Sequence, residues 1–242
     1  MRILDQMADK RPQAWFRPST VRELLVLRLA QKLGEPAAVQ HYAELARGHS
    51  DEILLLAYHR TLNHGHPPRD LGRHFHVELA LAKEQPDHAQ TDRLLAIKVE
   101  RRSIAVAVFV GSNLDFHDVR HLSSQSEKAE ASAIGFLNWV IGSFEIESAT
   151  LERMTNGNEI RRAALNRAIL DMLRASIIPI WEVGKRDLLE AYGYPALRTR
   201  IELRQAAQKI LWSMFNTDKP NCQELDAASL GLHVQTERCF LV

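Results

Sequence analysis

The residues between 153 and 209 carry side chains that could contact phosphate groups. This stretch contains eleven Lys and Arg residues against six Asp and Glu residues. Most of the eleven are arginines, whose guanidinium group suits bidentate contact with a phosphate. A solvated helix face, held by pairs such as Arg198 with Glu202, would give the same pattern, so both interpretations stay open. The basic residues of this stretch are Arg153, Arg161, Arg162, Arg167, Arg174, Lys185, Arg186, Arg198, Arg200, Arg204 and Lys209.

Eight of the eleven histidines lie between residues 41 and 88. His64 with His66, and His74 with His76, would each place two imidazoles on one side of an extended segment. Together these four side chains would suit a zinc ion or a similar metal. A His-rich surface turn around Pro67 is the simpler alternative, because no acid or thiol stands at a strong metal-binding spacing.

The overall composition limits the classes of protein to which the chain can belong. With 242 residues, of which 45% are hydrophobic and 25% charged, the chain can bury a sizeable core. The net charge of +1 carries no global signature of nucleic-acid binding, so any such surface must be local. The only two cysteines lack metal-like spacing and suit a reducing compartment, and no apolar run reaches 18 residues. We therefore expect a cytoplasmic globular protein that does not enter a membrane.

The periodicity of apolar residues, which indicates the secondary structure, changes near residue 90. A polar stretch that begins with a proline, residues 86–92, predicts a domain boundary there. Before it, apolar residues recur at helical spacing in several segments, which predicts an α-helical N-terminal module over residues 1–90. Residues 91–242 form the second expected domain.

Within the second domain, the order of the elements indicates the fold class. Three consecutive antiparallel strands joined by short turns come first. Two more strands follow, each preceded by a helix, as in parallel segments that helices cover. The expected strands are residues 94–100, 103–110, 114–122, 148–152 and 177–181, and the expected helices are about residues 126–141, 159–174, 198–215 and 222–233. This pattern predicts an α/β fold with a mixed sheet and flanking helices.

Four short motifs occur in an order that is typical of one group of nucleases. The hairpin 94–110 has a small-apolar second strand, and Glu152 ends the fourth strand in a Leu-Glu pair. A segment with Lys185 and Arg186 precedes a glycine-containing turn, and Asp226-Ala-Ala-Ser lies on the final helix. Over about residues 93–234 the chain resembles the RNase H-like superfamily, and within it the RuvC-type Holliday junction resolvases. A similar hairpin also occurs in ribosomal-RNA maturation nucleases of the YqgF type.

This resemblance implies an activity and a set of site residues. In such nucleases several carboxylates hold Mg²⁺ or Mn²⁺ ions that assist hydrolysis of a phosphodiester bond. Glu152 and Asp226 match two metal-binding positions, whereas Lys98 and Ser229 stand where the family carries Asp. Glu100 shares the strand face of Lys98 and offers a partial replacement. The resemblance also implies that basic residues near the last helices bind nucleic acid; we take these to be Lys185, Arg186, Arg198, Arg200 and Arg204.

Lys98 separates two interpretations of this site. In the first, its ammonium group neutralises Glu152 and Asp226 much as a metal ion would, and the site is a degenerate active site without activity. A rearranged site that uses Glu100 would instead keep metal-dependent activity. Under both interpretations Lys98, Glu152 and Asp226 should converge to within about 8 Å, by analogy with the spacing of a two-metal site.

Two functions therefore stay open. The first is a nucleic-acid-binding, RuvC-like protein that acts on branched or structured DNA or RNA, with or without endonuclease activity. The second is a catalytically inactive RNase H-fold scaffold that forms a homodimer or binds a protein partner through its N-terminal helices. A divalent cation at Glu152 and Asp226 is expected only for the enzyme.

Overall fold

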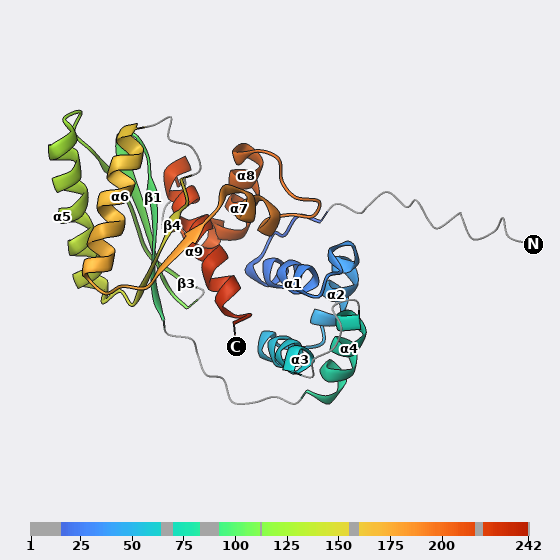
Figure 1. Ribbon diagram of the computed structural model, residues 1–242. Coiled ribbons are helices and arrows are strands. Elements are labelled where there is room, and N and C mark those ends of the chain that lie inside the picture. Colours follow the sequence, from blue (N-terminus) through green and yellow to red (C-terminus); the bar gives the residue numbers. More distant parts are fainter. Residues whose placement is uncertain are drawn as a thin grey trace, which may run out of the picture.

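A computed structural model describes residues 16–63, 70–82, 92–111, 113–154, 160–215 and 220–241. A sheet lies between two layers of helices, and a further group of helices from the N-terminal part packs beside one of these layers (Figure 1). Within the described ranges, we find no helix that is both long enough and apolar enough to cross a membrane.

The N-terminal part is helical, as the sequence predicts. Its elements are α1 (Val21–Lys32), a 3-10 helix (Pro36–Ala38), α2 (Val39–Ala46), α3 (Asp51–Asn63) and α4 (Leu71–Leu81). The Thr20 side chain accepts a hydrogen bond from the backbone N–H of Glu23 and so caps the start of α1. Leu27, Tyr42 and Phe75 come from three of these helices and are buried together in one apolar cluster.

The sheet is mixed and contains five strands in the order β3-β2-β1-β4-β5. These strands are β1 (Arg93–Val99), β2 (Ser103–Val110), β3 (Asn113–His121), β4 (Ser148–Glu152) and β5 (Ile180–Val183). The first three are antiparallel, while β4 runs parallel to both β1 and β5. The predicted fold class, a mixed α/β sheet preceded by a helical part, is thus confirmed.

Helices cover both faces of the sheet (Figure 1). One layer consists of α5 (Ser126–Phe144) and α6 (Ile160–Ala175); the other consists of α7 (Lys185–Ala191), α8 (Arg200–Leu211), a 3-10 helix (Trp212–Met214) and α9 (Cys222–Arg238). Leu95 and Ile97 of β1 pack with the first layer, and Leu94 and Ala96 with the second. Because side chains alternate along a strand, Lys98 lies on the face that α8 and α9 cover.

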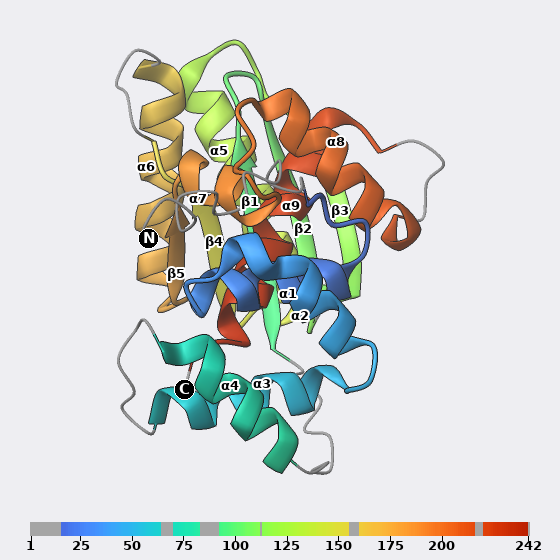
Figure 2. The ribbon, with the colours of Figure 1, turned by 90° about the vertical axis from the view of Figure 1, so that its right-hand side faces the viewer.

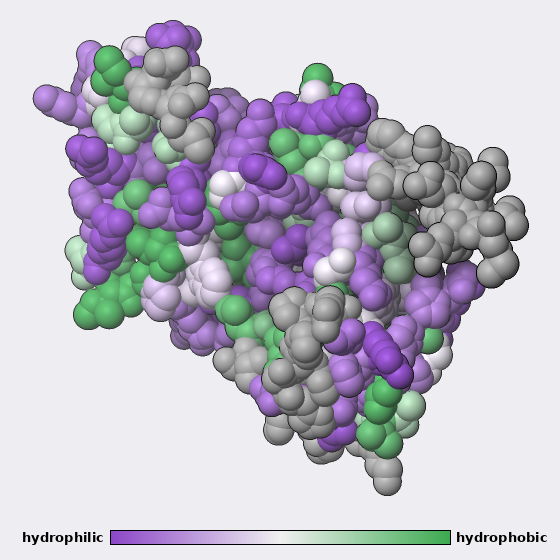
Figure 3. Space-filling model, turned by 45° about the vertical axis from the view of Figure 1, so that its right-hand side comes forward, coloured by the Kyte–Doolittle hydropathy of each residue, from purple (hydrophilic) through white to green (hydrophobic). Residues whose placement is uncertain are grey.

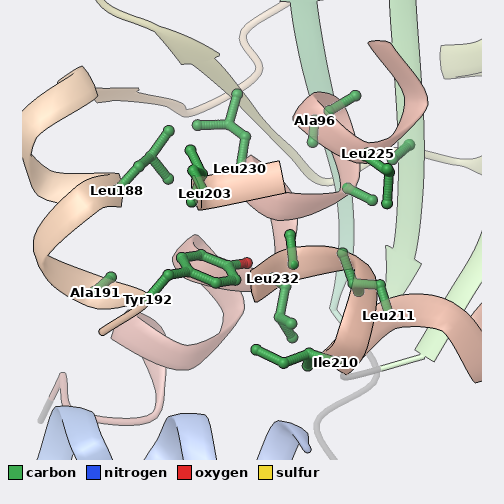
Figure 4. Packing of buried hydrophobic residues seen from close by; sticks show 14 of the residues in the cluster. Ala96, Leu188, Ala191, Tyr192, Leu203, Ile210, Leu211, Leu225, Leu230 and Leu232 are labelled. Atoms are coloured by element: carbon green, nitrogen blue, oxygen red, sulfur yellow. The ribbon is translucent and has the colours of Figure 1, made fainter. Parts of the chain in front are cut away.

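Helix α9 packs tightly against the sheet. All twelve of its residues from 225 to 236 are buried. Gly231 permits this approach, since a Cβ there would lie 2.5 Å from Cε2 of Phe109 and 3.0 Å from Cβ of Ala96. Tyr192 is also buried and donates a hydrogen bond of 2.8 Å to the backbone carbonyl of Ser229. Its ring lies beside the leucines that α8 and α9 contribute to this core (Figure 4).

Among the N-terminal helices, α1 lies beside α9 (Figures 1 and 2), and Tyr58 of α3 packs on Phe240 just after α9. Arg28 and Lys32 of α1 both form ion pairs with Glu237 of α9; the Lys32 Nζ to Glu237 Oε2 distance is 2.8 Å. Gln31 donates a hydrogen bond of 2.8 Å to the backbone carbonyl of Glu190. The boundary near residue 90, between a module of residues 1–90 and a domain of residues 91–242, stays a prediction.

Strand β5 begins three residues later than the sequence predicts. The N–H groups of Ile177 and Ile178 donate to the carbonyls of Arg174 and Leu173, so these residues close the C-terminal end of α6. Ile177 has a φ of +57° and a side chain exposed by 90%. This is the hydrogen-bond pattern of a Schellman motif, with Ile177 at the position that glycine usually takes. The apolar run therefore includes both a helix end and the strand.

The predicted grouping of histidines is wrong where the structure describes it. His74 and His76 lie within α4 rather than in an extended segment. Two residues apart on a helix, they point about 160° away from each other, so they do not share one side. His64 and His66 lie outside the described residues.

Candidate functional site

Glu152 and Lys98 meet at the carboxyl ends of two neighbouring parallel strands. Ile97 pairs with Leu151 in the register of β1 and β4, which places Lys98 beside Glu152 one residue further on. The side chains of Lys98 and Glu152 are only 2% and 9% exposed. The Lys98 ammonium donates a hydrogen bond to Oε2 of Glu152, and the two groups form a buried ion pair.

Asp226 reaches the same place from α9. Asn221 caps this helix by accepting hydrogen bonds from two backbone N–H groups, and Asp226 follows in the second turn. Arg204 of α8 holds its carboxylate in a bidentate arrangement, with Nε 2.9 Å from Oδ1 and Nη2 2.8 Å from Oδ2. Ser229, which stands where the resemblance implies an Asp, donates its hydroxyl to the carbonyl of Leu225 and is buried. Ser229 therefore binds its own helix backbone.

Arg200 connects the two acids. It is the first residue of α8, and it donates through Nη2 to Oε1 of Glu152. Its Nη1 atom lies 3.6 Å from Oδ2 of Asp226. Because Lys98 binds one of these acids and Arg200 binds both, the predicted convergence of Lys98, Glu152 and Asp226 is confirmed. Arg200 and Arg204 lie one helical turn apart, so both can face this site.

Two further charged residues lie at the edge of this group. Glu100 Oε1 is 3.7 Å from Lys98 Nζ, and its side chain is about one third exposed. Arg162 Nη2 is 3.8 Å from Oε2 of Glu152, and its Nε donates to the carbonyl of Val99. The sequence offered no signal for the contact of Arg162. We call this set the ion-pair cluster; its four cations and three carboxylates are Lys98, Arg162, Arg200, Arg204, Glu100, Glu152 and Asp226.

The pKa shifts in the ion-pair cluster follow from burial and from the neighbouring charges. Burial by itself would raise the pKa of Glu152, but Lys98 and Arg200 outweigh it, and the pKa is lowered. Burial lowers the pKa of Lys98, and the attraction of Glu152 opposes that change. The hydrogen bonds to Asp226 raise the pKa of Arg204. The Glu152 carboxylate is therefore ionised at neutral pH and already neutralised by cations of the protein.

The donor set does not fit the Mg²⁺ or Mn²⁺ ions that the resemblance implies. These ions require several free oxygen ligands, chiefly carboxylates. Every carboxylate oxygen of Glu152 and Asp226 has a Lys or Arg nitrogen within 3.8 Å. In the part of the chain that the structure describes, no group of three or more His, Cys, Asp or Glu side chains could hold a metal ion.

A second group of cations surrounds the cluster on the surface. Each member follows the carboxyl end of a strand or lies two residues before α8, and each is exposed. We call this group the basic rim, and its members are Arg101, Arg102, Arg153, Lys185 and Arg198. Arg186 is also exposed, but its Nε lies 2.6 Å from Oε1 of Glu190.

The basic residues that the sequence groups together thus divide into two sets. Lys185 and Arg198 face solvent, while the guanidinium groups of Arg200 and Arg204 face the buried carboxylates. A role of any of them in binding nucleic acid stays a prediction.

Comparison with known proteins identifies the fold but no sequence family. No protein-family model matches the chain, and no curated protein matches it by sequence. The structure of RuvC from Thermus thermophilus in complex with a Holliday junction substrate aligns with a TM-score of 0.50 at 14% identity. That alignment covers 61% of this chain and 95% of the other. The yeast mitochondrial Holliday junction resolvase aligns with a TM-score of 0.47 at 13% identity, over 78% of this chain and 94% of the other.

The chain therefore shares the mixed-sheet fold of the T. thermophilus RuvC structure.

Proposed function

We propose that this RuvC-like, RNase H-fold protein binds nucleic acid along the basic rim and does not hydrolyse it through the ion-pair cluster. The absence of hydrolysis is supported by one observation, the pairing of Glu152 and Asp226 with cations of the protein. A divalent ion placed between these acids would lie beside Lys98 and Arg200, and their positive charges would repel it. To bind, it would have to displace buried ion pairs whose separation leaves charges uncompensated.

Exposed cations support the proposed binding of nucleic acid along the basic rim. Arg101, Arg102 and Lys185 form no ion pair with any acid in the described part of the chain, whereas Arg198 lies beside Glu202, whose Oε2 accepts a hydrogen bond of 2.7 Å from the Arg198 backbone N–H. Exposed cations without acidic partners on one surface favour contact with phosphates. Hydrophilic side chains cover most of the face shown in Figure 3, and apolar ones form only small groups there. The related fold in RuvC of T. thermophilus has been solved in complex with a Holliday junction.

Fluorescence anisotropy tests the binding. The purified chain is titrated into labelled four-way junction DNA, linear duplex DNA and structured RNA at several salt concentrations. We expect affinity to fall as salt rises, and the double variant Lys185→Ala, Arg198→Ala to reduce the logarithmic salt slope by roughly 1–2, one for each lost phosphate contact. Arg174→Ala is the matched control, since this exposed arginine lies at the opposite end of α6, away from the rim. Equal loss in both variants would contradict the placement of the binding surface.

The same substrates test hydrolysis. In the presence of Mg²⁺ or Mn²⁺ we expect the wild type to leave all three substrates intact at concentrations that saturate binding. Cleavage by the wild type that disappears in Asp226→Asn, while binding persists, would establish the rearranged enzyme instead.

A scaffold that binds a protein is the second candidate. The observation that favours it is a groove between β3 and α5, in which Trp139 is 52% exposed and stacks on Phe136, with a ring-centroid distance of 6.1 Å. Half-exposed aromatic side chains are typical of protein interfaces. If all three nucleic acids fail to bind at low salt, the scaffold becomes the better proposal. Self-association, including a homodimer through the N-terminal helices, is then measured by sedimentation.

A further inference from the structure

Two histidines that are distant in sequence meet between helices of the N-terminal part. His41 lies on α2 and His76 on α4, and their Nε2 atoms are 3.3 Å apart. His41 is exposed, and His76 is half-buried, with its ring stacked on Tyr42. The imidazole nitrogens are thus accessible from solvent, while one of the two rings is held by packing.

The separation of the two nitrogens is the one that a shared metal ion requires. A tetrahedral zinc ion holds each imidazole nitrogen at 2.0–2.1 Å, which places two such nitrogens about 3.3 Å apart. The ring centroids of His41 and His76 are 5.0 Å apart, and the ring planes meet at 43°. This centroid distance is shorter than two rings aligned end to end would give, so the rings meet at an angle, as two ligands of one ion do.

Glu35 adds a negative charge beside this pair. The Tyr42 hydroxyl donates a hydrogen bond of 2.6 Å to Oε2 of Glu35. The Glu35 carboxylate packs against Gly72, where a Cβ would lie 2.4 Å from it. Gly72 and His76 are one turn apart on the same face of α4, so the carboxylate lies close to the histidine.

We propose that His41 and His76 bind one Zn²⁺ ion, or a similar borderline transition-metal ion, between α2 and α4. Imidazole nitrogen suits Zn²⁺, Ni²⁺ and Cu²⁺ and disfavours Mg²⁺. Two protein ligands leave coordination positions for water, and the negative charge of Glu35 beside α4 favours a bound cation. The bound ion would link α2 to α4 and stabilise the N-terminal helices.

Isothermal titration calorimetry with Zn²⁺ alone tests this site. It uses the full chain without a histidine tag, in a buffer that does not chelate metals. The wild type should bind one ion with a micromolar dissociation constant. His41→Gln and His76→Gln should each weaken binding more than about tenfold, because even the outer partners of metal ligands are worth that much. His41 is exposed, so its substitution leaves the core intact.

His74→Gln is the matched control, because His74 lies on the same helix and points in another direction. It should bind Zn²⁺ as the wild type does. Visible absorption of the Co²⁺-loaded wild type gives a second measurement that needs no variant, and tetrahedral nitrogen ligation should produce intense bands. Wild-type protein without binding heat or bands would overturn the proposal. Undiminished binding by His41→Gln, or equal loss in His74→Gln, would do the same, since either result places the ion elsewhere.

Discussion

Lys98 is an almost wholly buried ammonium group, and such a group is costly unless it is paired. Glu152 offsets that cost by direct contact, and Arg200 extends the pairing to Asp226. The charges of the ion-pair cluster therefore depend on one another. Removal of one cation leaves a buried carboxylate uncompensated, which destabilises more than the loss of a surface pair would.

Lys98→Asp should restore affinity for a divalent cation. The change removes the ammonium that neutralises Glu152 and adds a hard oxygen ligand beside it. At a Mn²⁺ concentration about ten times the dissociation constant, binding should stabilise the variant by about 1–2 kcal/mol and raise its Tm by roughly 2–6 °C. Differential scanning calorimetry with and without Mn²⁺ measures the shift.

Lys98→Met is the control for this measurement, because it removes the charge without adding a ligand. It should be destabilised and should show no Mn²⁺-dependent shift. An equal shift in the wild type, or none in Lys98→Asp, would count against our interpretation of the cluster.

The convergence of Lys98, Glu152 and Asp226 could be predicted, because the resemblance to RuvC-type nucleases implies that these positions meet at one site. The partners of the two acids could not. Arg200 and Arg204 have the same pattern in the sequence whether their guanidinium groups face a phosphate in solvent or a buried carboxylate. Only the packing of α8 over the edge of the sheet decides between these outcomes.

At the scale of elements, α9 combines small residues with near-complete burial. Gly231 lies where the helix approaches β1 and β2, and a methyl group there would meet Phe109 and Ala96. Glycine at this position lowers the helix propensity of α9 but allows the helix to pack closely on the sheet. This packing also holds Asp226, five residues earlier, against the ion-pair cluster.

Gly231→Ala should lower the free energy of unfolding by roughly 1–3 kcal/mol, the usual cost of overpacking, despite the better helix propensity of alanine. Urea denaturation measures this change. Gly135→Ala in α5 is the matched control, because no atom lies within 4 Å of the added Cβ. It should be neutral or stabilise by up to about 1 kcal/mol. If both variants are equally stable, α9 does not pack as described.

Most element types could be predicted from periodicity, and the antiparallel strands differ from expectation by one residue at most. The start of β5 could not be predicted, because Ile177 and Ile178 look like strand residues. Local sequence favours extension there, whereas hydrogen bonds to the last turn of α6 decide otherwise. The helical conformation of His74 and His76 could not be predicted for a similar reason, because a His-Phe-His sequence of three residues is compatible with a helix and with an extended segment.

At the scale of the whole molecule, stability should depend on pH through His233. This side chain of α9 is buried, and burial lowers its pKa to about 4, although Glu237 opposes that change. The unfolded chain takes up a proton near pH 6.5, but the folded chain does not until about pH 4. The folded state is thus fully favoured above about pH 6.5 and loses up to about 3 kcal/mol as pH falls towards 4.

Urea denaturation between pH 7 and 4.5 measures this loss. His233→Gln should show a shallower decline than the wild type, because glutamine takes up no proton. His121→Gln, at an exposed histidine, should decline as the wild type does. Equal slopes in the wild type and His233→Gln would show that His233 is not buried in its neutral form.

The position of α9 in the sequence has a consequence for the order of folding during synthesis. The ribosome completes β1 to β5 before it reaches α9, which begins 39 residues after the end of β5. Until then Leu94, Ala96 and Phe109 lack the helix that covers them. A nascent chain must therefore carry an apolar sheet face that α9 does not yet cover until this last helix is made. Chaperones that bind exposed apolar segments would meet this face, and premature termination before α9 would leave it exposed permanently.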